Sequence, residues 1–422
     1  MLTVWLSQNH LVRAALVCLA ASLFFAYELM QLHMVNAITP MLMADLQLSA
    51  TDLGILGSTY IMADVLFLLP AGLILDRFSI RKVILVALGL CVAGTVGFAC
   101  SNTLFQASIS HFFSGIGNAF CFLSCMLLCY RWFDVRWHGF VMGAMLTMGL
   151  LGAVLAQTPF SLLAELLTWR QALLVDAVAG LAVFALVFLF VVDRESSVRQ
   201  SVQNIPLFEG VKRSITNVQN IFCGIYTGMM NLPLMLLGAV WGSLFLTQVH
   251  GMQLVEASFV TGMIGMGTIV GSPLAGLVSD RIGKRVPVML VGAVSSLILF
   301  CCIAFTTSSS PLLFAGLFFA LGLTTSTQVL GYPLIAENSP AALTGTAMGT
   351  AGIVIMGLAL VLQPISGMLI DWGWDGALVA GARVYSNSNF MTAFALFPIG
   401  FAISVVLSCV IKDKRLQPCR EV

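Results

Sequence analysis

Three titratable side chains interrupt long apolar stretches of the sequence: Glu28, Asp64 and His111. An ionisable group inside a membrane-spanning helix is costly, so it commonly marks the path of an ion or a proton. A carboxylate in a cavity of low dielectric constant can take up a proton on one side of a membrane and release it on the other. Histidine changes charge near neutral pH and suits the same task. We therefore predict these three residues as proton carriers; the alternative is that they join neighbouring helices by hydrogen bonds.

Uncharged polar residues and a further histidine lie in the same apolar setting, where they could line a solute cavity. They are Tyr27, Gln31, His33, Asn36 and Tyr60 in the first half, and Tyr226, Asn231, Gln328, Tyr332 and Gln363 in the second. Hydrogen bonding between helices is the alternative role for such side chains in a bilayer.

Enzymatic chemistry finds no support in the sequence. It contains no catalytic constellation, no nucleotide-binding loop and no metal-ligand spacing. Cys121, Cys125 and Cys129 recur at helical spacing, and we predict that they pack inside a helix rather than bind a metal. We therefore predict no catalytic residue, no metal and no cofactor.

The elements that position these residues are predicted to be membrane-spanning helices. Only 9% of the 422 residues are charged and the mean hydropathy is +1.01. A helix needs about 20 apolar residues to cross a bilayer. The apolar runs, divided at their Gly, Pro, Ser and Asn breaks, predict an all-α membrane protein with twelve transmembrane helices, near residues 12–38, 52–75, 82–100, 104–130, 138–163, 171–192, 217–247, 254–279, 286–306, 312–336, 342–370 and 389–411.

Positive charge predicts the orientation. With both termini in the cytoplasm, every lysine and arginine except Arg170 and Arg383 falls on the cytoplasmic side. We therefore predict a protein integral to the cytoplasmic (inner) membrane. Residues 193–216 form the longest polar stretch and are predicted to be a cytoplasmic linker between an N-terminal six-helix bundle, residues 1–192, and a C-terminal one, residues 217–422.

A charged turn between apolar runs occurs twice. The two aspartates, at positions 76 and 280, are separated by 204 positions, close to half the chain. Each copy contains a glycine, an acid and a base: Gly72, Asp76 and Arg77 in the first, and Gly276, Asp280 and Arg281 in the second. This spacing indicates a duplicated membrane protein.

The repeated turn resembles G-x-x-x-D-R-x-G-R/K-R/K, the signature of the major facilitator superfamily of secondary transporters. The second copy matches it fully, whereas Ser79 replaces a glycine in the first. The segment from His111 to Gly117 also resembles the family's R-x-x-x-G-x-G motif, with histidine in place of an arginine associated with proton coupling.

The resemblance implies two pseudo-symmetric six-helix bundles that work by alternating access. It also implies that Asp76 and Asp280 join networks with cytoplasmic arginines that close the inner gate. Arg131 or Arg136 is then the expected partner of Asp76.

We predict a monomeric secondary active transporter in the lipid bilayer, with no role in nucleic-acid binding. It would import a small nutrient of the amino acid, peptide or nucleoside class by symport, driven by the proton gradient. The segment from Phe24 to Lys82 is similar to nutrient importers of the phagosomal-transporter type. Gly149 to Gly152 lacks the proline of the antiporter motif, which favours symport over efflux.

Three alternatives stay open. His33 and His111 would suit a polycarboxylate siderophore, imported or exported. A drug efflux antiporter and a membrane sensor that transports nothing are the others. The loop from Trp372 to Asn389 is either an ordered cap over the external entrance or an exposed loop.

Overall fold

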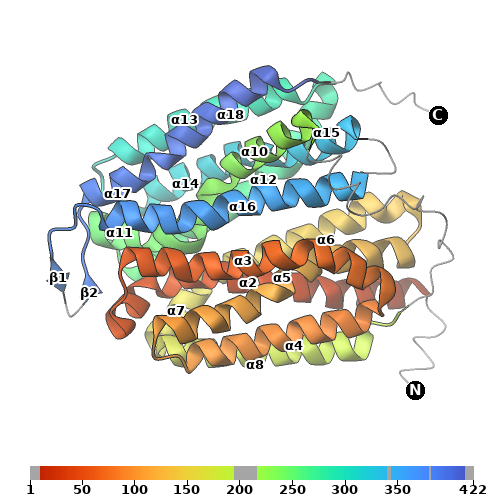
Figure 1. The fold of residues 1–422 in the computed structure, drawn as a ribbon, viewed down its shortest axis with the longest axis horizontal. Helices are drawn as coiled ribbons and strands as arrows, with labels where there is room; N and C mark the ends of the chain where they lie inside the picture. Colours follow the sequence, from red (N-terminus) through yellow and green to blue (C-terminus); the bar gives the residue numbers. More distant parts are fainter. Residues whose placement is uncertain (1–9, 194–215, 340–343, 380–381, 414–422) are drawn as a thin grey trace. The chain divides into compact units, whose positions relative to one another are not determined.

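The computed structural model describes residues 10–193, 216–339, 344–379 and 382–413. Within these ranges, twelve helices are long and apolar enough to cross a membrane, which confirms the predicted all-α class and number of spans (Figure 1). Contacts divide the chain into two compact units: unit 1 is residues 1–42 and 59–200, and unit 2 is residues 43–58 and 201–422. The predicted linker lies almost wholly outside the described residues, so the predicted bundle boundaries stay a prediction.

The first six spans follow one another with short connections. They comprise α2 (His10–Leu46), α3 (Ala50–Arg77), α4 (Ile80–Ala99), α5 (Leu104–Trp132), α6 (Val135–Leu155) with α7 (Thr158–Leu166), and α8 (Trp169–Phe190). Ser79, Thr103 and Thr168 cap the starts of α4, α5 and α8 through their side-chain oxygens. In unit 1, α4 packs against both α5 and α8. Apolar and sulfur side chains, including Cys121 and Cys125, fill the core between α2, α3, α4, α5 and α8.

The other six spans contain more interruptions. They comprise α10 (Val218–Leu232), the π-helix η1 (Pro233–Trp241) and α11 (Gly242–His250); α12 (Leu254–Ile282); α13 (Val286–Phe305); α14 (Pro311–Thr325), the 3-10 helix η2 (Ser326–Leu330) and α15 (Gly331–Asn338); α16 (Thr344–Asp371); and α17 (Asn387–Phe394) with α18 (Leu396–Val410). Pro233 opens the π-helical stretch, as expected where a proline disrupts the helical hydrogen-bond ladder. Within unit 2, α12 packs on α14, α13 on α18, and α10 on α16.

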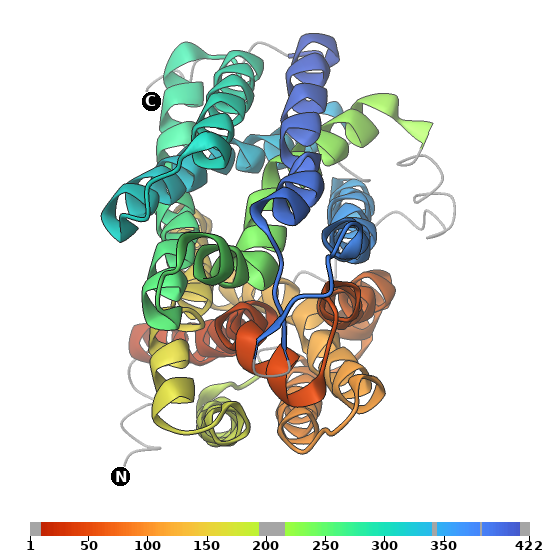
Figure 2. The ribbon, with the colours of Figure 1, turned by 90° about the vertical axis from the view of Figure 1, so that its left-hand side faces the viewer.

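The connection between α16 and α17 contains two short strands among its described residues. It carries strands β1 (Leu378–Val379) and β2 (Ala382–Arg383), which pair antiparallel as a hairpin (Figure 2). Trp372, Leu378 and Val379 are exposed, as in the predicted exposed loop; a role as a cap over the external entrance stays a prediction.

Candidate functional site

Glu28 and Tyr60 form the centre of a buried polar cluster in unit 1. Glu28 on α2 and Tyr60 on α3 both have 0% exposed surface. The Tyr60 hydroxyl lies 3.0 Å from the Glu28 carboxylate oxygen Oε2 and 2.9 Å from the Glu28 carbonyl oxygen. It can donate its proton to either. The other carboxylate oxygen, Oε1, has no hydrogen-bond partner among the described residues.

Two glycines of α5 make room for this pair. A Cβ atom at Gly115 would lie 2.3 Å from the backbone oxygen of Tyr60, and one at Gly117 would lie 2.0 Å from Glu28 Oε1. Both distances are far below van der Waals contact, so any side chain at Gly115 would force α3 away from α5. The G-x-G spacing noticed in the sequence therefore has a packing reason.

His111 lies one turn before these glycines and is also buried. Its ring lies against Tyr60, with 5.0 Å between the ring centroids, and against Phe98 at 5.5 Å. Its Nδ1 atom has no hydrogen-bond partner among the described residues. Two of the three predicted proton carriers, His111 and Glu28, thus contact the same tyrosine.

Asp64, the third predicted carrier, lies one turn after Tyr60 on α3 and is buried. It interacts with the side chain of Asn118 on α5 and electrostatically with Glu28. The structure therefore brings all three predicted carriers into one region of unit 1. Their transfer of protons stays a prediction.

Asp176 on α8 is a fourth buried titratable group, which our sequence interpretation missed. The Gln31 amide donates to its Oδ2 atom at 2.5 Å, and Thr95 donates to Gln31 Oε1 at 2.9 Å. The hydroxyl of Tyr27 lies 3.5 Å from that of Thr95. Asp176 interrupts an apolar run as Glu28 does, so the rule that selected Glu28 would have selected it too.

The central parts of the described membrane-spanning helices contain no lysine or arginine. Every lysine or arginine in a membrane-spanning segment lies within three residues of one of its ends. A buried carboxylate without a partner cation costs several kcal/mol unless it is protonated. The cluster of Glu28, Asp64 and Asp176 is therefore suited to hold protons.

Asn36 and His33, the remaining predicted cavity residues of the first half, have hydrogen-bond partners within unit 1. Asn36 donates to Gln157 at 2.8 Å. His33 Nδ1 lies 2.9 Å from the carbonyl oxygen of Leu29, and its Nε2 has no partner among the described residues. Tyr27 and Gln31, by contrast, belong to the chain of contacts that reaches Asp176.

The predicted cavity residues of the second half mostly contact other helices of unit 2. Tyr226 donates to the carbonyl oxygen of Met289 at 2.8 Å, and Gln363 donates to that of Met235 at 2.9 Å. Asn231 and Gln328 are buried, whereas Tyr332 is 36% exposed. For Tyr226 and Gln363 the structure shows the alternative, hydrogen bonding between helices; contact with a solute stays a prediction for all ten residues.

The second charged turn is held by ion pairs. Asp280, with its side chain 67% exposed, lies 3.8 Å from Arg285, and Arg285 lies 2.7 Å from Glu337 on α15. The arginine that pairs with Asp280 is therefore Arg285. Arg281, which follows Asp280 in the sequence, is exposed. Gly276 has open space around it, so this conformation does not require a glycine there.

The first charged turn is described only in part. Arg77 is exposed and Arg131 is half-buried. The side chains of Asp76 and Arg136 lie outside the described part of the structure, so the expected partner of Asp76 stays a prediction. A Cβ atom at Gly72 would make only ordinary contact, 3.9 Å from Leu123.

An acid beyond the last helix of each half supports these turns. Asp193 accepts hydrogen bonds from the Ser79 hydroxyl and, at 3.2 Å, from the backbone N–H of Arg81. Asp413 accepts from the backbone N–H groups of Arg285 at 2.9 Å and Val286 at 3.0 Å. The same interaction thus recurs in both halves, at the start of α4 and of α13. Sequence reasoning missed it because these partners are distant along the chain.

Comparisons with known proteins agree with this architecture. The model of the family described as Major Facilitator Superfamily matches residues 16–239 and 221–406. Membrane sensor protein UhpC of Salmonella typhimurium is 24% identical over 85% of this chain and 87% of its own length. The probable sulfoacetate transporter SauU of Cupriavidus necator is 23% identical, covering 89% of each chain.

Solved structures show the same fold. The nucleoside transporter NupG superposes with a TM-score of 0.73 at 12% identity, over 94% of this chain and 100% of that one. The D-xylose-proton symporter superposes with a TM-score of 0.74 at 15% identity, over 98% and 99%. These matches confirm the predicted fold class of two six-helix bundles, and they are to transport-type membrane proteins rather than enzymes.

Proposed function

Since this chain belongs to the Major Facilitator Superfamily, we propose that it is a proton-coupled importer of a small polar nutrient, of the amino acid, peptide or nucleoside class. The observation that carries the proposal is the cluster of three buried carboxylates in unit 1, Glu28, Asp64 and Asp176, in spans that have no interior lysine or arginine. Import would use the proton gradient without a bound cofactor.

Tyr60 offers a physical link between protonation and conformation. When Glu28 is charged, the stronger acceptor for the Tyr60 hydroxyl is the carboxylate oxygen at 3.0 Å. When Glu28 is protonated, the backbone carbonyl at 2.9 Å becomes the better acceptor. Protonation would thus change how α2 and α3 are held together. Because His111 packs on the same ring, it would respond to that change.

The charge inventory favours a solute without net negative charge. Sulfoacetate, which the name of one relative mentions, is an anion. Anion recognition in proteins commonly uses arginine or lysine, and no lysine or arginine of this chain lies more than three residues inside the end of a described span. A zwitterion or an uncharged polar solute fits such walls better. A polycarboxylate siderophore would depend on His33 and His111 alone, and a drug efflux antiporter finds no added support.

A membrane sensor is the second candidate function. It is favoured by one observation, the 24% identity to Membrane sensor protein UhpC along most of both chains. A sensor would bind its solute without moving it, so measured transport separates the two functions.

We further propose that the protein is a monomer in the inner membrane with both termini in the cytoplasm. The distribution of lysine and arginine supports this orientation. Labelling of a cysteine introduced at Arg77 or Arg281 from the two sides of the membrane tests it. Access to both positions from the periplasmic side would contradict it.

Uptake into proteoliposomes tests the transport proposal. Radiolabelled amino acids, peptides, nucleosides, sulfoacetate and iron-chelate siderophores would be offered with and without an inward acid gradient. We expect accumulation of at least one uncharged or zwitterionic solute, and only with the gradient. Accumulation that ignores the gradient would contradict proton symport, and binding without accumulation would favour the sensor.

A further inference from the structure

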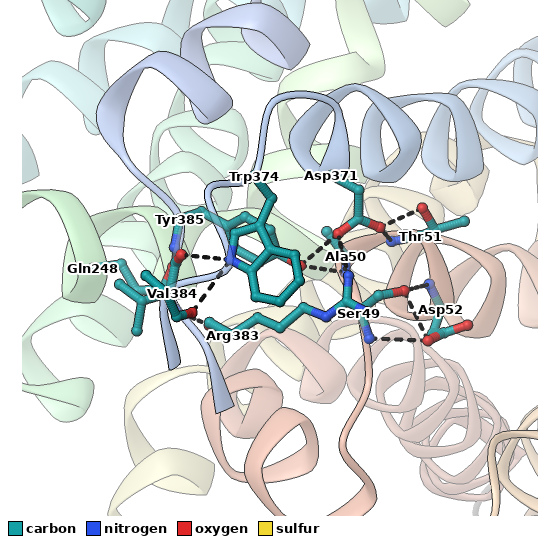
Figure 3. Close-up of polar contacts among 11 residues, drawn as sticks. Ser49, Ala50, Thr51, Asp52, Gln248, Asp371, Trp374, Arg383, Val384 and Tyr385 are labelled. Atoms are coloured by element: carbon teal, nitrogen blue, oxygen red, sulfur yellow. Dashed lines mark hydrogen bonds and ion pairs between the residues drawn. The ribbon is translucent and has the colours of Figure 1, made fainter. Parts of the chain in front are cut away.

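The last residue of α16 holds the first turn of α3. The Asp371 carboxylate accepts hydrogen bonds from the backbone N–H of Thr51 at 2.8 Å, from the Thr51 hydroxyl at 2.5 Å and from the backbone N–H of Ala50 at 3.3 Å (Figure 3). The N–H groups of a helix's first turn have no partner within the helix, and they favour an anion. Asp371 therefore binds the end of α3 through charge as well as hydrogen bonds.

The hairpin connection completes the arrangement. Tyr385 donates to Asp371 at 2.6 Å and accepts from the backbone N–H of Ala50 at 2.9 Å. Arg383 pairs with Asp371 at 3.3 Å and stacks over the ring of Trp374 at 4.3 Å. Burial raises the pKa of the Tyr385 hydroxyl, so it keeps the proton that it donates to Asp371. Figure 3 shows these side chains converging on the start of α3.

Close backbone contacts between α3 and α16 add to these hydrogen bonds. A Cβ atom at Gly54 would lie 2.6 Å from the backbone oxygen of Gln363, and one at Gly367 would lie 2.4 Å from that of Ala50. Residues 43–58 accordingly group with unit 2, whereas the rest of α3 groups with unit 1.

These contacts can be broken without unfolding α3. Ser49 and Asp52 cap the helix locally: each accepts from the backbone N–H of the other, at 3.1 and 2.9 Å. The side chain of Asp371 is 18% exposed and that of Arg383 is 34% exposed, so water can replace the lost partners. Charged hydrogen bonds that water can reach can be broken and remade, which suits reversible release of the start of α3 from α16.

We propose that Asp371, Arg383 and Tyr385 form a latch, which holds the outer end of α3 to unit 2 in one state of the transport cycle. Release of this α3 latch lets residues 43–58 move with the rest of α3. The proposal rests on the proposed transport function and on the alternating access that the family resemblance implies. Arg383 is one of the two bases that fall outside the predicted cytoplasmic side, so we assign the latch to the external side of the membrane.

Cysteine accessibility tests the latch directly. Ala50 is fully buried, so an Ala50→Cys reporter should react slowly with a membrane-impermeant maleimide, measured against the chain without the reporter. Asp371→Asn keeps the size of the side chain but removes its charge. We expect Asp371→Asn and Tyr385→Phe each to raise the labelling rate, the former by roughly tenfold because a charge-assisted contact is lost.

Asp375→Asn is the matched control, since Asp375 is an exposed acid of the same connection. We expect it to leave the labelling rate unchanged. Equal rates in all variants would overturn the latch, and so would equal acceleration by Asp375→Asn, which would indicate general loosening. Labelling needs neither a solute nor a proton gradient, so failure of the latch is distinct from failure of proton-coupled import.

Discussion

The two units differ in the kind of polar group that they bury. Unit 1 buries three carboxylic acids, Glu28, Asp64 and Asp176, and two histidines. Among the described residues of unit 2, every buried polar side chain is uncharged, mostly serine and threonine. A change in protonation can therefore alter the interior of unit 1 and leave that of unit 2 as it is. The described charges that hold the second turn and the α3 latch lie at helix ends or in the connection between α16 and α17.

Substitution of Glu28 is the strongest test of the difference between the two units. Coupling free energies between sites are typically about 1–3 kcal/mol, so Glu28→Gln should lower gradient-driven accumulation roughly 5–150-fold. Exchange of labelled for unlabelled solute across the membrane should persist, because it needs no net proton movement. Glu165→Gln, at an exposed acid of α7, is the control. Full accumulation by Glu28→Gln would remove this residue from the proton path.

Glycine substitutions compare the packing of the units. Gly115→Ala should lower stability by about 1–3 kcal/mol, because the new Cβ overlaps the α3 backbone. Gly276→Ala meets open space and should be neutral or stabilising by up to about 1 kcal/mol, the helix propensity difference. Unfolding midpoints in detergent measure both. Equal effects at the two glycines would contradict the described approach of α5 to α3.

Asp176 should contribute less to proton coupling than Glu28. It lies at the far end of a hydrogen-bonded series that runs from Thr95 through Gln31 to Asp176. We expect Asp176→Asn to lower gradient-driven accumulation roughly fivefold, the low end of typical coupling. The pH dependence of uptake should shift as well, which a purely structural role would not cause. An unshifted pH profile would show that Asp176 serves packing alone.

Two tyrosines give the smallest and most closely matched test. Tyr226→Phe in unit 2 removes the hydrogen bond to Met289 and should cost about 1 kcal/mol of stability. In the Tyr226→Phe variant, the dependence of uptake on the acid gradient should stay unchanged. Tyr60→Phe in unit 1 removes the same kind of group but should weaken that dependence. Loss of gradient dependence in Tyr226→Phe would erase the distinction between the units.

Much of the fold could be predicted from the sequence, because span length and charge placement are local properties. The twelve spans followed from apolar runs and their breaks. Glu28, Asp64 and His111 followed from the cost of burying an ionisable group. Asp176 was missed although the same rule covers it.

The α3 latch could not be predicted from the sequence. Asp371 and Thr51 are 320 positions apart, and helical periodicity indicates which face is polar but not which helix it meets. The caps that Asp193 and Asp413 provide were missed for the same reason.

Proton movement into the lumen of proteoliposomes tests the central claim most directly. A trapped pH-sensitive dye would report lumen acidification when a transported solute is added outside. The account predicts acidification with the wild-type chain and none with the triple variant Glu28→Gln, Asp64→Asn, Asp176→Asn, although that variant still exchanges solute. Solute accumulation without acidification, or acidification that survives in the triple variant, would contradict the claim that unit 1 carries the proton.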